Sequence, residues 1–171
     1  MPWTISDTGG SNALRLQTTF SALDGAEVKW GWTEDSQDYP DGQSIHQRAA
    51  VHHFGATIEN GFGRGIRIQI PARPILTETF ERNAEQLVVL SEALNDEIID
   101  TMVNDVRPAL RVIGQFAQTN MVLDFDRAQG ELEPLAPSTI ANKARDGRSR
   151  PEQRLEETGH LRSQVRFEIT T

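Results

Sequence analysis

The chain has 171 residues, of which 37% are hydrophobic and 6% aromatic, so it has the length of one domain and a polar composition. It contains no cysteine, which excludes disulfides, thiolate metal sites and cysteine nucleophiles. Acidic residues outnumber basic ones by 25 to 17, and the net charge of −8 argues against a protein that holds nucleic acid through its phosphates.

The N-terminal part of the chain is predicted to be rich in β-strand. Met1–Gly10 lacks the basic and apolar stretches of a signal peptide, and we expect it to form an extended arm. Leu14–Gln17 and Ala26–Trp30 both alternate apolar and polar residues, with Asp24-Gly25 as a turn between them. Two adjacent antiparallel strands are therefore expected. Along the whole chain, no apolar run approaches the roughly 18 residues of a membrane span.

A short helix and a strand are expected next. Ser44 is a suitable N-cap for a helix that runs to about Phe54, and Gly55 is a suitable stop. After a flexible glycine-rich stretch, Ile66–Ile70 alternates apolar and polar residues and ends at Pro71, which predicts a strand closed by proline.

The middle of the chain is predicted to be helical. From Thr77 to about Val106 apolar residues recur at helical spacing and form an amphipathic stripe. The polar stretches Asn83–Gln86 and Asn95–Glu97 are predicted break points, so two helices are expected here. Pro108 then fits the first turn of a further helix.

The C-terminal part is predicted to contain two exposed loops, a short helix and a strand. The loops are Asp124–Leu135 and Asp146–Gln153, and Ser138 is expected to cap the helix between them. Val165–Ile169 alternates, and we expect this strand to rejoin the N-terminal sheet. The predicted fold class is α+β, with a small antiparallel or mixed sheet packed with several helices in a single domain over residues 1–171.

Histidines are the first candidates for a chemical site. His46, His52 and His53 lie on one predicted helix, but two zinc-binding histidines on a helix are spaced by four residues with a glutamate between them. The spacings here are six and seven, without an intervening glutamate. A structural or surface role is favoured for these residues and for His160, and a metal-dependent hydrolase is kept as an alternative.

Other patterns also fail to indicate catalysis. Gly61–Gly65 lacks the spacing and the lysine of a phosphate-binding loop. The acidic pairs Asp124/Asp126 and Glu156-Glu157 have polar neighbours and are interpreted as surface charge. We therefore predict that the chain is not an enzyme and has no catalytic, cofactor-binding or metal-binding residues.

Five basic residues gather near the C-terminus, and Asp146 and Glu152 lie among them. They are Lys143, Arg145, Arg148, Arg150 and Arg154. The favoured interpretation is a solvated loop. The alternatives are a contact with an acidic neighbouring subunit or with the DNA backbone, the latter in a nucleic-acid-binding accessory protein.

Four sequence boxes occur in a fixed order. We call them the turn box (Tyr39–Ser44, YPDGQS, followed by a helix to Gly55), the IPARP box (Ile70–Ile75), the PLAPS box (Pro134–Lys143) and the TGHLR box (Leu155–Ser163). Together they resemble the phage virion-morphogenesis or tail-completion family, over roughly residues 28 to 170. The chain departs from the family pattern at His52-His53, Ile75 and Glu156-Glu157, where the family has Asn-Glu, an aromatic residue and Ile-Asp.

The resemblance implies a structural role in a virion. Members of the family resemble tail-terminator and neck components, which are small α+β subunits assembled as a ring, commonly of six copies, at the head-proximal end of the tail. The implied partners are further copies of the chain, tail-tube proteins and head–tail connector proteins, with DNA passing through the lumen without specific binding. Assembly would take place in the cytoplasm of the bacterial host, without a membrane or a cofactor.

The boxes also suggest where subunits would touch. The prolines at 71, 74, 134 and 137 restrict the chain before folding and form rigid corners. Such corners would present the following helices to a neighbour in a fixed orientation. The candidate subunit-interface residues are Pro71, Arg73, Pro74, Pro134, Pro137, Lys143, Thr158 and Leu161.

Overall fold

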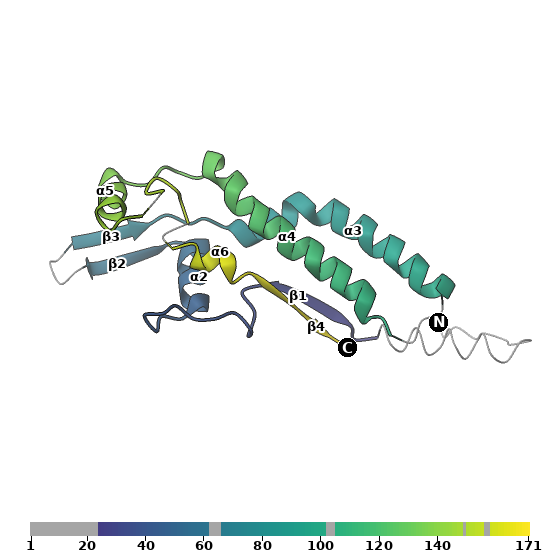
Figure 1. The fold of residues 1–171 in the computed structure, drawn as a ribbon. Helices are drawn as coiled ribbons and strands as arrows, with labels where there is room; N and C mark the ends of the chain where they lie inside the picture. Colours follow the sequence, from purple (N-terminus) through teal and green to yellow (C-terminus); the bar gives the residue numbers. More distant parts are fainter. Residues whose placement is uncertain (1–23, 62–65, 102–104, 149, 156–157) are drawn as a thin grey trace, which may run out of the picture.

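A computed structural model describes residues 24–61, 66–101, 105–148, 150–155 and 158–171. Within these residues the chain is an α+β protein with five helices and four strands. A long hairpin of two helices covers one small sheet, and a second small sheet lies with a short helix at the other end of the molecule (Figure 1). The elements in order are β1 (Glu27–Gly31), α2 (Ile45–Phe54), β2 (Ala56–Gly61), β3 (Ile66–Ile70), α3 (Ile75–Thr101), α4 (Arg107–Glu131), α5 (Pro137–Arg145), α6 (His160–Ser163) and β4 (Arg166–Thr170).

The first sheet joins the two ends of the described chain. β1 pairs with β4 in antiparallel orientation, with Glu27 opposite Thr170 and Gly31 opposite Arg166. The predicted return of the C-terminal strand to the N-terminal sheet is therefore confirmed. Apolar residues pair across one face, as with Trp30 and Phe167, and α4 covers both strands. The expected strand at Leu14–Gln17 and the arm at residues 1–10 lie outside the described residues.

The second sheet is separate from the first. β2 and β3 form an antiparallel pair, with Ala56 opposite Ile70 and Ile58 opposite Ile68, and the pairing is irregular between Ile58 and Gly61. The predicted α+β class with a small antiparallel sheet is confirmed, and the strands form two such pairs, because β3 pairs with a strand that the sequence did not indicate. β2 has the sequence ATIENG, in which a single large apolar residue gives no alternation.

Helix α2 begins and ends where the sequence indicates. Ser44 occupies the N-cap position, although its side chain makes no capping hydrogen bond. The N–H of Ile45 instead donates to a carboxylate oxygen of Asp38 at 2.8 Å. Gly55 ends the helix with φ of 73° and ψ of 168°, a conformation that is almost confined to glycine.

Gly55→Ala is expected to destabilise the protein by about 2 kcal/mol, because the backbone conformation is strained for alanine. A Cβ at this position would also lie 2.8 Å from the carbonyl oxygen of Ile70. Gly42→Ala is the matched control, since Gly42 also has positive φ but would place its Cβ in open space. It should cost about 1 kcal/mol. Urea denaturation measures both, and equal losses would mean that the contact at Gly55 does not matter.

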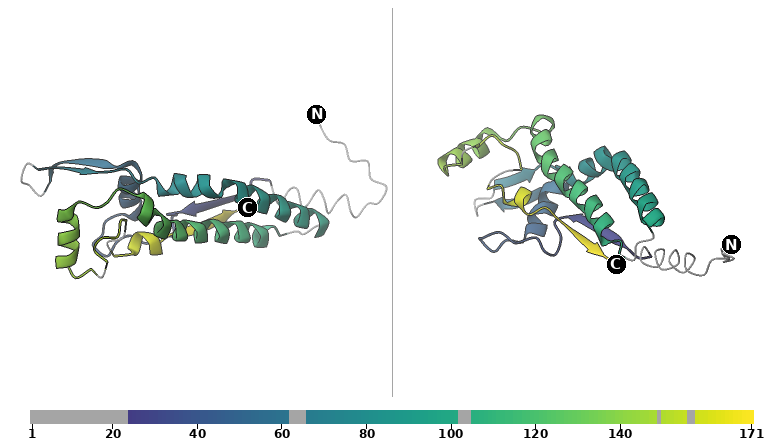
Figure 2. Two further views of the ribbon diagram at one scale, coloured as in Figure 1. Left: turned by 90° about the horizontal axis from the view of Figure 1, so that it is seen from above. Right: turned by 45° about the vertical axis from the view of Figure 1, so that its right-hand side comes forward.

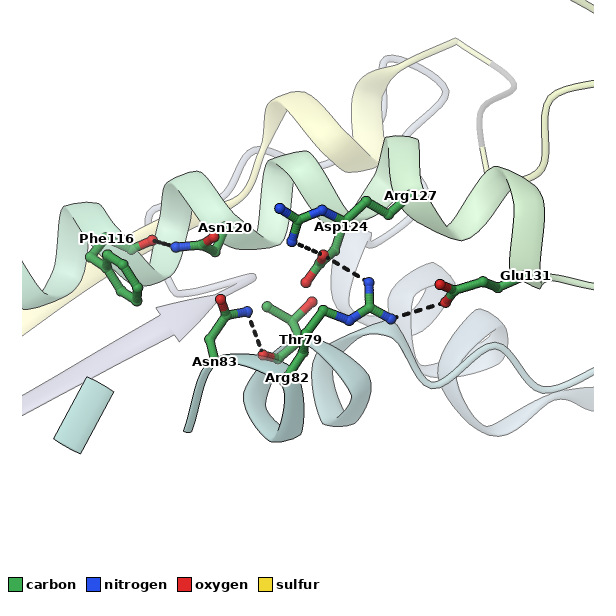
Figure 3. A network of polar contacts seen from close by, with 8 residues as sticks. All are labelled: Thr79, Arg82, Asn83, Phe116, Asn120, Asp124, Arg127 and Glu131. Carbon is green, nitrogen blue, oxygen red and sulfur yellow. Dashed lines mark hydrogen bonds and ion pairs between the residues drawn. The ribbon is translucent and has the colours of Figure 1, made fainter. Parts of the chain in front are cut away.

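Helix α3 is continuous, which contradicts the prediction of two helices. It runs for 27 residues through both predicted break points. At the first of them, the side-chain amide of Asn83 donates to the carbonyl of Thr79 at 2.8 Å and is buried against α4 (Figure 3). The asparagine thus satisfies its polar group inside the helix and does not interrupt it.

Helix α4 extends beyond its predicted end. The residues from Asp124 to Glu131 were expected to be an exposed loop, but they form the last two turns of a 25-residue helix. Asp124 is buried, and its carboxylate accepts from Arg82 of α3 at 3.2 Å and from Arg127 at 3.0 Å (Figure 3). Asp124 is therefore an interior charge, and only its neighbour Asp126 fits the prediction of a surface carboxylate.

The core lies where the second half of α4 meets α2, the start of α3 and the TGHLR region. Its centre is formed by Ile45, Met121 and Val165, which are nearly inaccessible to solvent. Trp30 and Trp32 pack against this cluster from the segment that contains β1. The core thus holds one end of the helical hairpin to the region that carries the boxes.

The PLAPS region agrees with the sequence in outline. The chain is extended up to Ala136, and α5 then begins at Pro137, so Ala136 and not Ser138 is the N-cap. The described part of the 146–153 loop has no regular structure and is mostly exposed, as expected. Within the described residues, no helix combines the length and the apolar character that a bilayer span requires.

Candidate functional site

The four boxes, which are far apart in the sequence, meet in the fold around one pocket. This junction pocket has a volume of about 770 Å³ and lies between β3, α5 and the extended segment before α5. All four boxes contribute to its lining, through residues that include Tyr39, Pro71, Arg73, Pro134, Lys143 and Leu155. β3 and α5, which both contribute lining residues, lie at the same end of the molecule (Figure 1).

Tyr39 and Arg48 connect the turn box to the rest of the junction. The guanidinium carbon of Arg48 lies 3.9 Å from the centre of the Tyr39 ring, a cation–π contact. Arg48 also donates to Asp41 at 2.7 Å and to the side chain of Gln43 at 2.7 Å. The 39–43 turn is thereby fixed to helix α2, and the tyrosine ring is held between two pockets.

The second pocket joins the turn box to the TGHLR box. It has a volume of about 430 Å³, and Tyr39, Arg148 and His160 are among its lining residues. The ring centroids of Tyr39 and His160 are 4.5 Å apart, and Nε2 of His160 lies 2.9 Å from the carbonyl oxygen of Gln37. Gly159 precedes this histidine in the left-handed conformation and turns the chain into α6.

Arg73 is the most unusual residue of the junction pocket. It is 6% exposed, and its Nε is buried without a hydrogen-bond partner among the described residues. Burial lowers the pKa of this guanidinium, the negative charge of Glu133 raises it, and the positive charge of Arg154 lowers it. A buried arginine that lines a pocket is suited to pairing with a carboxylate that enters from outside.

No family model, curated protein or solved structure matches the chain. The proposed function therefore rests on the chain's own residues and on the resemblance of its four boxes.

Six of the eight predicted interface residues are accessible. Pro134, Pro137 and Thr158 are exposed, while Pro71, Pro74 and Lys143 are half-buried. Four of the eight line the junction pocket, namely Pro71, Arg73, Pro134 and Lys143.

Two predicted interface residues are buried within the chain itself. Leu161 is 3% exposed and belongs to the hydrophobic core, where its carbonyl accepts from the indole of Trp32 at 2.8 Å. It therefore holds α6 in place. Arg73 is likewise buried in its own chain, so a partner could reach it only through the junction pocket.

The basic cluster is divided between the interior and the surface. Arg154 points inward and donates to the carbonyls of Gln129 and Glu133 at the end of α4. The Nζ of Lys143 donates to the carbonyl of Gln153 at 2.7 Å. Arg145 lies at the surface, with 74% of its side chain exposed and Asp146 3.7 Å away.

The histidines lie in different surroundings. Nε2 of His46 is 3.2 Å from the carbonyl oxygen of Thr33, the ring of His53 contacts that of Phe54 edge to face, and His52 lines the junction pocket. In the part of the chain that the structure describes, no group of three or more histidine, aspartate or glutamate residues could hold a metal ion. Gly61–Gly65 and Glu156-Glu157 fall wholly or largely outside that part.

Sequence reasoning missed one residue that organises the junction. Gln129 accepts from the backbone N–H of Arg154 at 2.7 Å and donates to the carbonyl of the same residue at 2.9 Å. Its side chain thus pairs with the loop as a neighbouring strand would. Nothing in the sequence near Gln129 signals this role, because its partner lies 25 residues further along the chain.

Proposed function

We propose that the chain is a structural protein of a tailed-phage virion, which completes the tail and joins it to the head as part of a ring at the neck. The observation that carries the proposal is the convergence of the four boxes on one junction. Sequence segments from residue 39 to residue 163 position each other there, through contacts such as those of Tyr39 with His160 and of Arg48 with Asp41.

The junction holds two elements that project at one end of the molecule. The β2–β3 hairpin and α5 both extend from it and make few contacts with the other elements (Figure 2). A two-stranded hairpin is marginally stable alone in water. Exposed apolar side chains accompany it, with Phe54 at 76% and Ile58 at 44% exposure. These features suit a subunit that completes its burial against neighbouring proteins, for which tail-tube and connector proteins are the proposed partners.

The nucleic-acid-binding alternative receives less support from the geometry. Arg154, one of the five basic residues on which it depends, is bound to main-chain carbonyls of its own chain. The remaining residues lie in a chain of net charge −8, which opposes contact with phosphates. A virion subunit that lets DNA pass without holding it agrees better with this charge.

Deletion of the gene from its phage is the experiment that tests the proposal. We expect DNA-filled heads and separate tails, with tails of abnormal length or with heads that do not attach, and no infectious particles. Negative-stain microscopy and a plaque count measure this, and expression of the intact chain in trans should restore infectivity. Normal infectious virions from the deletion would overturn the proposed function.

A further inference from the structure

Helix α3 carries an acidic stripe on the side that faces away from the core. The helix contains seven acidic residues against one arginine, a net charge of −6. Glu81, Glu85, Glu92 and Asp96 are exposed and recur at spacings of four and seven residues, which places them along one face. Among the described residues, no salt bridge neutralises any of these four carboxylates.

The stripe contains exposed apolar residues. Val88 is 55% exposed and Val89 is 60% exposed, and both lie between Glu85 and Glu92 on the helix. Like charges four residues apart, as in Glu81 and Glu85, destabilise a helix, and valine is a weak helix former. An apolar centre with a charged rim is the usual composition of a protein interface. This face therefore has the features of a surface that another protein covers.

The opposite end of the molecule has the complementary character. Residues 137–154 carry five basic and two acidic side chains, and without Arg154, which is bound to main-chain carbonyls of its own chain, the segment still has a net charge of +2 in a chain whose total is −8. Helix α5 buries none of its nine residues, and so short a helix is marginal without a packing partner. Lys143 and Arg145 lie in its last turn, next to the half-buried Ile140.

The two faces cannot meet within one molecule. α5 lies at the end of the molecule that carries the β2–β3 hairpin, whereas α3 runs away from that end, and all views agree on this (Figures 1 and 2). We propose that the acidic face of α3 in one copy binds the basic α5 end of the next copy. The occupant of each face is thus a second copy of this chain, in a head-to-tail contact of the kind that generates rings.

The inference rests on the proposed function only for the ring that such contacts would close. The contact itself can be tested with the purified full-length chain by sedimentation velocity over a range of salt concentrations. Wild-type protein is expected to self-associate at low salt and to dissociate as salt rises, because the contact is electrostatic. A chain that stays monomeric at low salt and high protein concentration would overturn the proposal.

Charge reversal identifies the surfaces. Glu81→Lys/Glu85→Lys and Arg145→Glu/Arg150→Glu should each weaken self-association about tenfold or more, because each places like charges opposite one another. An equimolar mixture of the two variants should associate again, because both contacts between unlike variants are charge-matched: in one of them both faces are reversed, and in the other both faces are unaltered. Failure of the mixture to associate would contradict the pairing of these two faces.

Two controls separate the contact from net charge and from folding. Glu27→Lys/Glu34→Lys changes the net charge by the same amount on exposed residues outside both faces, and association should stay within about twofold of wild type. Val88→Gln replaces an exposed valine by a better helix former, so the monomer should stay folded by circular dichroism while association weakens. Unchanged association of Val88→Gln would count against the apolar centre.

The two proposals can fail separately. If the deletion phage lacks joined heads and tails but the purified chain does not associate through these faces, the neck function stands and this interface is wrong. If charge-matched association is found but the deletion phage is normal, the interface stands and the neck function is wrong.

Discussion

Arg82→Met/Arg127→Met is expected to destabilise the protein by about 3–5 kcal/mol, because it leaves a buried carboxylate without a cation. The side chain of Asp124 is 4% exposed, and these two arginines are its salt-bridge partners within the described residues. Its second oxygen is buried without a hydrogen bond, so no other group there can take over the charge. Urea denaturation at neutral pH measures the loss.

The control for this prediction is an exposed ion pair between α6 and the same helix α4. Arg162 donates to Asp126 at 2.7 Å, but the carboxylate is about half exposed, so Arg162→Met should cost at most about 1 kcal/mol. Adding Asp124→Leu to the double arginine variant should recover much of the stability, since the unpaired charge is then gone. Equal losses for the double variant and Arg162→Met would show that the buried position of Asp124 does not matter.

Gly114→Val is expected to destabilise the protein by about 3–4 kcal/mol, because it forces extra atoms into a well-packed contact. Gly114 is buried on the side of α4 that faces the first sheet, and a Cβ there would lie 2.2 Å from a ring carbon of Phe167. The ring would have to leave its position against α4, and the pairing of β4 with β1 would be disturbed. Thermal unfolding measures the loss.

Two further variants test the cause. Gly130→Val places the same side chain on the same helix where a Cβ meets nothing within 4 Å, so stability should change by less than about 0.5 kcal/mol. Combining Gly114→Val with Phe167→Ala should cost less than the sum of the single changes by about 1 kcal/mol or more, as expected for residues in contact. Strict additivity would mean that the ring is not the obstacle.

The strands and helix boundary that the sequence predicts correctly are marked by local patterns. Ala26–Trp30, Ile66–Ile70 and Val165–Ile169 alternate, and each coincides with a strand to within one residue. Gly55 ends α2 as expected, because a single backbone conformation decides that boundary. The α+β class followed from these elements. In each case the information lies within a few neighbouring residues.

The incorrect parts depend on partners that are distant in the sequence. Asp124 looks like surface charge until Arg82, 42 residues away, reaches it from the facing helix. Asn83 predicts a helix break from its residue type alone. In the fold its side-chain amide donates to a carbonyl of the same helix, and the residue is buried against α4. The convergence of the four boxes on the junction pocket is of the same kind. It is a tertiary arrangement, and no local pattern in the boxes indicates which of them face each other.

The pairing of β1 with β4 has a mechanical consequence. Glu27 at the start of β1 lies opposite Thr170 at the end of β4, so the chain enters and leaves this ladder at the same end. A force that pulls the two chain ends apart at this end of the ladder would act along the hydrogen bonds, because antiparallel bonds run perpendicular to the strands. The bonds would therefore break one pair at a time, beginning at the pair of Glu27 and Thr170.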